Sequence, residues 1–173
     1  DAIPDSDATD FNGRGAWYQG LKLALFDVSD PSTPTEIKSM IIGKRGTSSD
    51  LLYDHHALAY LPPLDGQPAR LAIPVDLHDT VPDHDSFDPR NPWSSYDWTH
   101  TGLYMFEIDS GSTSETAHAD LRLAGTLVVE TRQADRRYPE GYRFTDRAVL
   151  LNNSVHYVHN ADVWSAQWGK KEH

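Results

Sequence analysis

The sequence contains no cysteine, and this absence removes several kinds of chemistry at once. Disulfide bonds, thiolate nucleophiles and cysteine-ligated zinc are all excluded. A cysteine-free chain is indifferent to redox state, so cysteine usage does not indicate in which compartment the protein works. Any catalysis or metal binding must therefore use oxygen or imidazole groups.

Long apolar runs and an excess of positive charge are also missing. No apolar stretch reaches the roughly 18 residues that a transmembrane helix needs, so no membrane span is expected. The chain has 15 Lys and Arg against 26 Asp and Glu, which gives a formal net charge of −11. That charge repels phosphate backbones and anionic lipid, so no nucleic-acid partner is expected. Cations, basic proteins and neutral saccharides are compatible with it.

The short motifs of several common enzyme classes do not occur. There is no Gly-x-Ser-x-Gly nucleophile elbow, no phosphate-binding Gly-x-x-x-x-Gly-Lys and no His-Glu-x-x-His zinc helix. The paired carboxylates of glycoside hydrolases depend on a separation in space, which a sequence does not show. The sequence therefore explains no reaction and favours a protein that is not an enzyme.

The composition that is present is typical of a globular all-β domain. Hydrophobic residues make up 38% and charged residues 24% of the 173 residues, enough for one domain with a real core. Residues 1–16 are rich in Asp, Gly and Pro, and predict a flexible acidic linker or arm. From residue 17 to residue 173, short apolar runs alternate with turn residues, as in all-β proteins.

The apolar runs predict about nine antiparallel strands in groups of two, four and three. The predicted strands cover residues 20–28, 36–42, 57–61, 69–75, 102–108, 121–130, 147–151, 155–158 and 162–168. Four strands joined by short turns are what one blade of a β-propeller requires. The expected fold is therefore all-β, a partial β-propeller of two to three blades.

An ordered set of short motifs makes this expectation more specific. Tyr-Gln-Gly-Leu-Lys-Leu (18–23) leads into Leu-Phe-Asp-Val-Ser-Asp-Pro (25–31), and Ile-Gly-Lys-Arg-Gly-Thr (42–47) is followed by Leu-Tyr-Asp-His (52–55). Ile-Pro-Val (73–75), Gly-Leu-Tyr (102–104), Arg-Ala-Val-Leu (147–150) and Val-His-Tyr (155–157) complete the set. In this order the motifs resemble those of secreted bacterial and archaeal proteins with a C-terminal β-propeller domain, distantly related to WD-type repeats.

The resemblance covers roughly residues 17–165 and implies a propeller in a secreted or cell-envelope protein. It implies no catalytic residues. The chain departs from the family pattern in two places: His56 stands where the family usually has Lys, and residues 76–101 form an insertion without a counterpart. An activity particular to this protein would therefore be expected in the insertion.

Groups of two, four and three strands cannot close a ring, because a propeller usually has at least four blades. We therefore expect the chain to be the C-terminal part of a larger propeller. Uncovered strand edges invite pairing with other chains. The isolated chain is thus expected to self-associate.

The 76–101 insertion contains six candidate metal ligands. They are Asp76, His78, Asp79, Asp83, His84 and Asp85. Such residues could hold calcium through oxygen, or zinc through His and carboxylate, and calcium is the more expected ion. No established ligand spacing is met, so a solvated acidic loop is the more ordinary interpretation.

Three aromatic residues follow in the same insertion, Trp93, Tyr96 and Trp98. Exposed aromatic rings stack on saccharides or anchor protein contacts, whereas packed ones cover the core beneath a long loop. The loop's length favours packing, and binding is the alternative.

Asp54 and His55 precede the third predicted strand and offer either a metal or acid–base site or a structural link between blades. The structural role is favoured. Adjacent residues of a strand face opposite ways, so His55 and His56 are not expected to share one ion.

Two functional hypotheses follow. The first is an exported propeller segment that acts as a binding or scaffold module for a protein or a saccharide. The alternative is a calcium- or zinc-dependent hydrolase with its site in the 76–101 insertion.

Overall fold

The computed structural model describes residues 2–4, 16–109, 119–140, 145–169 and 171–172. About half of these residues lie in β-strands, and the rest form turns, loops and two short 3-10 turns, η2 (Asp50–Leu52) and η3 (His55–Ala57). Within the described ranges, no helix has the length and apolar character needed to cross a membrane. The predicted all-β class is confirmed.

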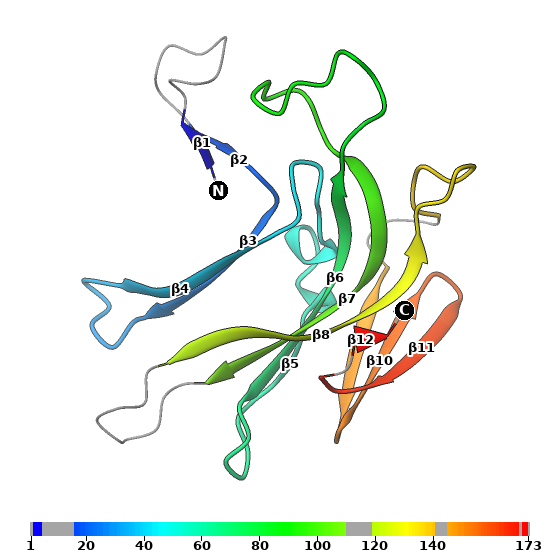
Figure 1. The fold of residues 1–173 in the computed structure, drawn as a ribbon. Coiled ribbons are helices and arrows are strands. Elements are labelled where there is room, and N and C mark those ends of the chain that lie inside the picture. The colour runs from blue at the N-terminus through cyan, green and yellow to red at the C-terminus, as the bar shows by residue number, and fades with distance from the viewer. Residues whose placement is uncertain (1, 5–15, 110–118, 141–144, 170, 173) are drawn as a thin grey trace.

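All nine predicted strands are present, and they group as two, four and three (Figure 1). The first sheet holds β3 (Leu21–Asp27) and β4 (Thr35–Ile42). The second holds β5 (Ala59–Leu61), β6 (Ala69–Thr80), β7 (Asp97–Asp109) and β8 (Asp120–Thr131). The third holds β9 (Arg147–Leu151), β10 (Ser154–His159) and β11 (Asp162–Gln167). Neighbours within each group pair antiparallel, as a partial propeller requires.

Three short strands were not predicted. β1 (Ala2–Pro4) lies in the predicted arm and pairs antiparallel with β2 (Ala16–Tyr18), which begins at the end of that arm; most of the arm lies outside the described residues. β12 (Lys171–Glu172) pairs in parallel with β8 and extends the central sheet to five strands.

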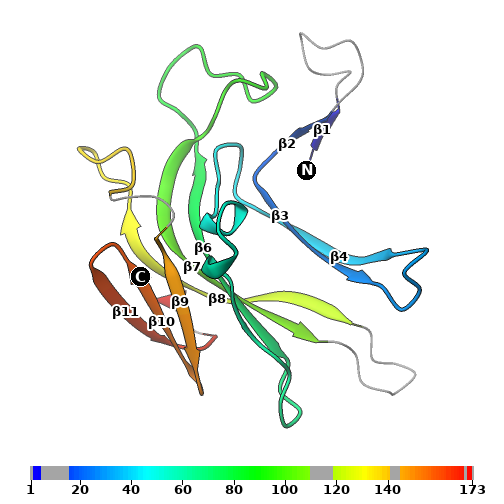
Figure 2. The same cartoon turned by 180° about the vertical axis from the view of Figure 1, so that it is seen from behind.

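The central sheet lies between the two other sheets and is covered on both faces (Figure 2). Against β9–β11 it buries one cluster: Ala72, Leu103, Met105, Leu127, Val155, Tyr157, Ala166 and Trp168. Against β3–β4 it buries the other: Ile42, Leu71, Ile73, Val75, Tyr104, Phe106 and Leu121. Since successive side chains of a strand point to opposite faces, β6 and β7 serve both clusters, which explains their near-continuous apolar sequence.

The long insertion is shorter than its sequence indicated. β6 continues to Thr80 and β7 begins at Asp97, so the connecting loop is residues 81–96. The pairs Asp76–Thr101 and Leu77–His100 extend the ladder beyond the apolar centre of both strands.

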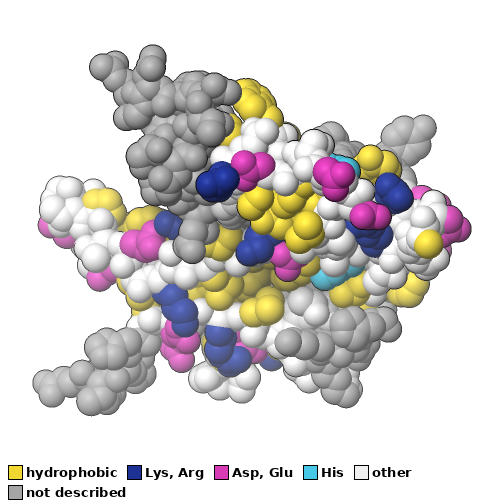
Figure 3. All heavy atoms as spheres, turned by 45° about the horizontal axis from the view of Figure 1, so that its top comes forward, with side chains coloured by type: hydrophobic (Ala, Val, Ile, Leu, Met, Phe, Trp, Pro, Cys, Tyr) yellow, Lys and Arg dark blue, Asp and Glu magenta, His cyan; other side chains and the backbone are white. Residues whose placement is uncertain are grey.

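Charges are mixed on the face that carries this end of the sheet. Figure 3 shows acidic and basic side chains interspersed around exposed hydrophobic ones. The described part of this face therefore has no continuous acidic surface, despite the net charge of −11.

Candidate functional site

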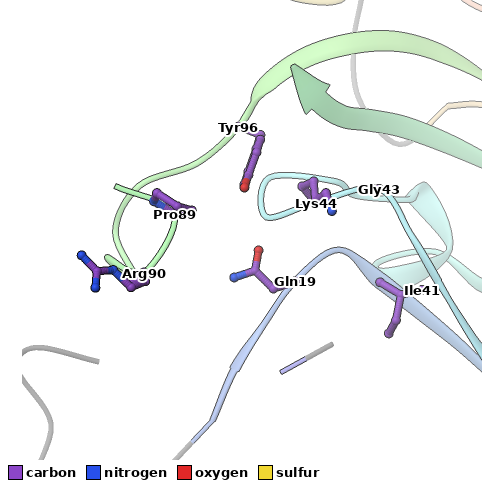
Figure 4. A pocket seen from close by; sticks show the side chains of 7 residues that line it. All are labelled: Gln19, Ile41, Gly43, Lys44, Pro89, Arg90 and Tyr96. Atoms are coloured by element: carbon purple, nitrogen blue, oxygen red, sulfur yellow. The ribbon is translucent and has the colours of Figure 1, made fainter. Parts of the chain in front are cut away.

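A cleft of about 430 Å³ opens where loop 81–96 approaches the turns before β3 and after β4. It is lined by Gln19, Ile41, Gly43, Lys44, Pro89, Arg90 and Tyr96. In Figure 4 the Tyr96 hydroxyl and the Gln19 amide point into the space between loop and turns. The lining thus combines polar groups, two cationic side chains and an aromatic ring.

Glycines allow the two turns to lie against each other. Gly20 has a φ of 79°, and a Cβ there would lie 2.4 Å from the carbonyl oxygen of Ile42. Gly43 has a φ of 65°, and its Cβ would collide with the Thr47 hydroxyl. A side chain at either position would be strained and would push the turns apart.

Arg45 fastens loop 81–96 to the turn after β4. Its Nε donates to the Ser94 carbonyl at 2.5 Å and its Nη2 to the Pro89 carbonyl at 2.9 Å. Its own carbonyl accepts from the backbone N–H of Tyr96 at 2.9 Å. Burial lowers the pKa of Arg45, and the nearby Tyr96 and Asp88 oppose that shift. One side of the cleft is therefore held by the guanidinium group.

His78 holds the same end of the loop through Tyr96. Its Nδ1 lies 2.7 Å from the Tyr96 carbonyl oxygen, which can only accept, so Nδ1 carries the hydrogen. The ring packs directly against Gly46, where a Cβ would lie 2.7 Å from Nδ1. His78 therefore supports the cleft from behind.

The six predicted metal ligands lie in different settings. Asp76, on β6, accepts from the Thr101 hydroxyl at 2.5 Å, and His78 is occupied by Tyr96. Asp79 is exposed near the end of β6, and Asp83, His84 and Asp85 are exposed in the loop. Among the described residues, the group of three possible ligands that comes together is a different one: Asp54, His55 and His56.

The three aromatic residues also separate. Trp98 is 1% exposed, and its Nε1 donates to the Thr101 hydroxyl at 3.2 Å inside the fold. Tyr96 is half-buried in the cleft, and Trp93 is 74% exposed on the loop. Only Tyr96 and Trp93 are thus placed to contact a ligand.

The Asp54–His56 turn differs from its sequence interpretation. Residues 55–57 form η3 instead of the start of a strand, and the ring centroids of His55 and His56 lie 4.0 Å apart. The expectation that His55 and His56 face opposite ways rested on strand alternation, and it is wrong because these residues are not in a strand. The Asp54 side chain caps the turn by accepting from the His56 N–H at 2.9 Å.

Asp54 also connects this turn to the third sheet. Its second carboxylate oxygen pairs with Arg147 of β9 at 2.5 Å. The hydrogen bonds from the backbone and the ring of His56, together with the charge of Arg147, lower the pKa of Asp54 to about 2. Asp54 therefore links the second and third sheets.

Sequence reasoning missed a buried ion-pair network centred on His159. Its Nδ1 lies 2.9 Å from Asp146 and its Nε2 3.3 Å from Glu130, and the Tyr157 hydroxyl donates to the same Asp146 carboxylate. Burial alone would lower the pKa of His159, but the bonds and charges of Asp146 and Glu130 raise it to about 9. The inward alternation of Val155, Tyr157 and His159 was the available signal.

One sheet built on four antiparallel strands, packed between sheets of two and three strands, is the arrangement of neighbouring propeller blades. The family profile described as Beta propeller domain matches residues 5–170. The chain belongs to this β-propeller family. No curated protein and no solved structure gives a significant match.

Proposed function

We propose that this chain is a non-enzymatic binding module, and that its cleft binds a carboxylate-bearing saccharide. The observation that carries the proposal is the cleft lining: Lys44 and Arg90, the Gln19 amide and the Tyr96 ring surround one opening in an acidic chain. A β-propeller commonly serves as a scaffold that presents such a loop-lined site, and its membership in the family supports this use.

Each lining group has a counterpart in an acidic sugar. The Lys44 ammonium complements a carboxylate, and among the described residues no ion pair occupies it. The Arg90 guanidinium lies 3.4 Å from Asp88 on the same loop, so it is available only if it exchanges that partner. The Gln19 amide can both donate to and accept from hydroxyl groups. The Tyr96 ring offers an apolar face to the C–H side of a pyranose.

The remaining polar groups support binding over catalysis. His159, which has the chemistry of a general base, is nine-tenths buried and held between two carboxylates. A metal-dependent hydrolase in the insertion would require its six ligands to converge, whereas Asp76 and His78 are engaged with Thr101 and Tyr96.

The proposal is tested by titrating the chain with a galacturonate oligosaccharide and with a neutral galactose oligosaccharide of equal length. We expect the acidic ligand alone to bind, and Lys44→Glu to weaken it by about tenfold, equivalent to about 1.4 kcal/mol. Arg137→Glu, at an exposed position outside the cleft, is the matched control. Equal binding of both sugars, no binding of either, or an unchanged affinity in Lys44→Glu would refute the proposal.

We further propose that the protein carrying this domain is exported to the cell envelope or medium. The support is the ordered motif resemblance to secreted propeller proteins. Fractionation of the producing cells, with detection by an antibody against this domain, tests it. Recovery in the cytoplasm only would contradict export.

A further inference from the structure

We propose that Asp54, His55 and His56 form a binding site for a divalent transition metal, with zinc as the reference ion. One ligand atom from each residue lies within 4.8 Å of those from the other two. The two imidazole rings stand side by side on η3, with centroids 4.0 Å apart. The site lies apart from the cleft and does not depend on the proposed saccharide binding.

The donor set suits zinc. Two imidazoles and one carboxylate with a solvent position left open is an established zinc arrangement, with bonds of about 2.0–2.2 Å. Small side-chain rotations would bring the three ligand atoms from their observed spacing to these bond lengths. His56 can make them because its side chain is 69% exposed, and His55 is also exposed. Solvent can fill the remaining coordination positions.

The backbone that carries the ligands is already fixed. Asp54 caps the turn through the His56 N–H, and the Leu58 N–H bonds to the His55 carbonyl at 3.1 Å. Binding an ion therefore costs little additional backbone entropy, because folding has already fixed the turn.

Arg147 supplies an outer contact of the kind found around metal-binding carboxylates. It bonds one Asp54 oxygen and leaves the other, Oδ1, 2.9 Å from His56 Nδ1. Carboxylates that bind metals are commonly oriented by such a hydrogen bond. The positive charge of Arg147 also weakens cation binding, so we expect micromolar rather than nanomolar affinity.

A bound ion would act where two blades meet. Asp54 belongs to the segment before β5, whereas Arg147 begins β9 in the next sheet. An ion that binds only the folded state stabilises it by RT ln(1 + L/Kd), where L is the concentration of the free ion and Kd its dissociation constant. Zinc binding should therefore raise the melting temperature by stabilising the contact between this turn and β9.

The test is calorimetric titration of the untagged chain with zinc chloride. We expect one zinc per chain, and a loss of affinity of about tenfold or more in His55→Gln and in His56→Gln, since each removes one ligand. His84→Gln, which removes an exposed imidazole from loop 81–96, is the matched control and should bind as the wild type does.

Melting curves without zinc show whether each variant is folded. The zinc-induced rise in melting temperature should be smaller in His55→Gln and in His56→Gln, and unchanged in His84→Gln. Wild-type zinc affinity in the His55→Gln, His56→Gln double variant would overturn the site. So would the absence of binding at about 1 mM zinc, a concentration that detects affinities as weak as about 4 kcal/mol. Because no saccharide is used, this outcome is independent of the cleft.

Discussion

His159 is a positive charge held in the interior by Asp146 and Glu130, with its side chain only 10% exposed. The third sheet uses it to join the end of β10 to Glu130 on β8, and Asp146 receives a further bond from Tyr157. Removing one member of such a network leaves a buried charge without a partner, which is strongly destabilising. The network is therefore a structural element of the blade contact.

The stability of the protein should depend on pH through this residue. The pKa of His159 is raised from its ordinary value of 6.5 to about 9, so the folded state holds this proton more tightly than the unfolded state. The resulting stabilisation, up to about 3 kcal/mol, is complete below pH 6.5 and is lost as the pH rises to 9. Urea unfolding at pH 6, 7.5 and 9.5 measures it.

The comparison with His159→Gln isolates this residue from other titrating groups. The difference in unfolding free energy between wild type and His159→Gln should shrink over that pH window. His156→Gln removes an imidazole from the opposite face of the same strand and is the control. A difference that stays constant from pH 6 to 9.5 would show that His159 is not charged in the folded state.

Single residues were the hardest features to predict from the sequence. Trp98 could be assigned to packing only as one of two alternatives, because exposure depends on what lies beneath a loop. His55 and His56 were expected to diverge because a strand was assumed, whereas the Asp54 cap produces a 3-10 turn. The partners of His159 come from β8 and from the start of β9, and no local pattern connects them.

Among the elements, loop 81–96 is held in large part by one side chain from the turn after β4. Arg45 contributes two hydrogen bonds from its guanidinium group to loop carbonyls. Bonds from a charged donor are worth about 1.5–3 kcal/mol each. The loop's position over the cleft is therefore set from outside the loop.

Arg45→Met should release this loop while leaving the sheets folded. We expect trypsin to cleave after Arg90 about a hundredfold faster or more, because the population of the open loop rises when two bonds worth at least about 3 kcal/mol together are lost. Lys44→Met removes the neighbouring exposed cation and should leave the cleavage rate unchanged. Mass spectrometry of the first cleavage product measures the rate. Equal rates in Arg45→Met and wild type would mean that the loop is held by other contacts.

The nine main strands could be predicted because each has an apolar centre of strand length bounded by turn residues. The extensions of β6 and β7 could not. Asp76, His78 and Thr80 alternate with Leu77 and Asp79, and this mostly polar stretch looks like a loop until its partner strand is known. The ladder there follows from the pairing already begun in the apolar centre.

For the molecule as a whole, the outer face of the third sheet carries exposed apolar side chains. Val149, Leu151 and Val163 are 53%, 56% and 66% exposed. Val149 and Val163 alternate with residues that face the buried cluster, so they belong to the opposite side of the sheet. The third sheet thus has one face that packs on the central sheet and one face that is exposed.

We expect the isolated chain to self-associate through this face and the adjoining strand edges. Light scattering should give a mass above the 19.4 kDa of one chain. The double variant Val149→Asp, Val163→Asp should return the mass to that of a monomer, whereas Val81→Asp, at an exposed loop position, should not. A monomeric wild type at milligram-per-millilitre concentration would contradict this prediction.

Both buried clusters beside the central sheet require the same pairing register of its strands. A slip of β6 by one residue would replace Leu71, Ile73 and Val75 on one side with Ala72 and Pro74, and would force the larger side chains into the space shaped for Ala72. Both packed clusters would then be disrupted. Because each outer sheet packs on the same register of the central sheet, a substitution that destabilises one blade contact should also destabilise the blade contact on the other face.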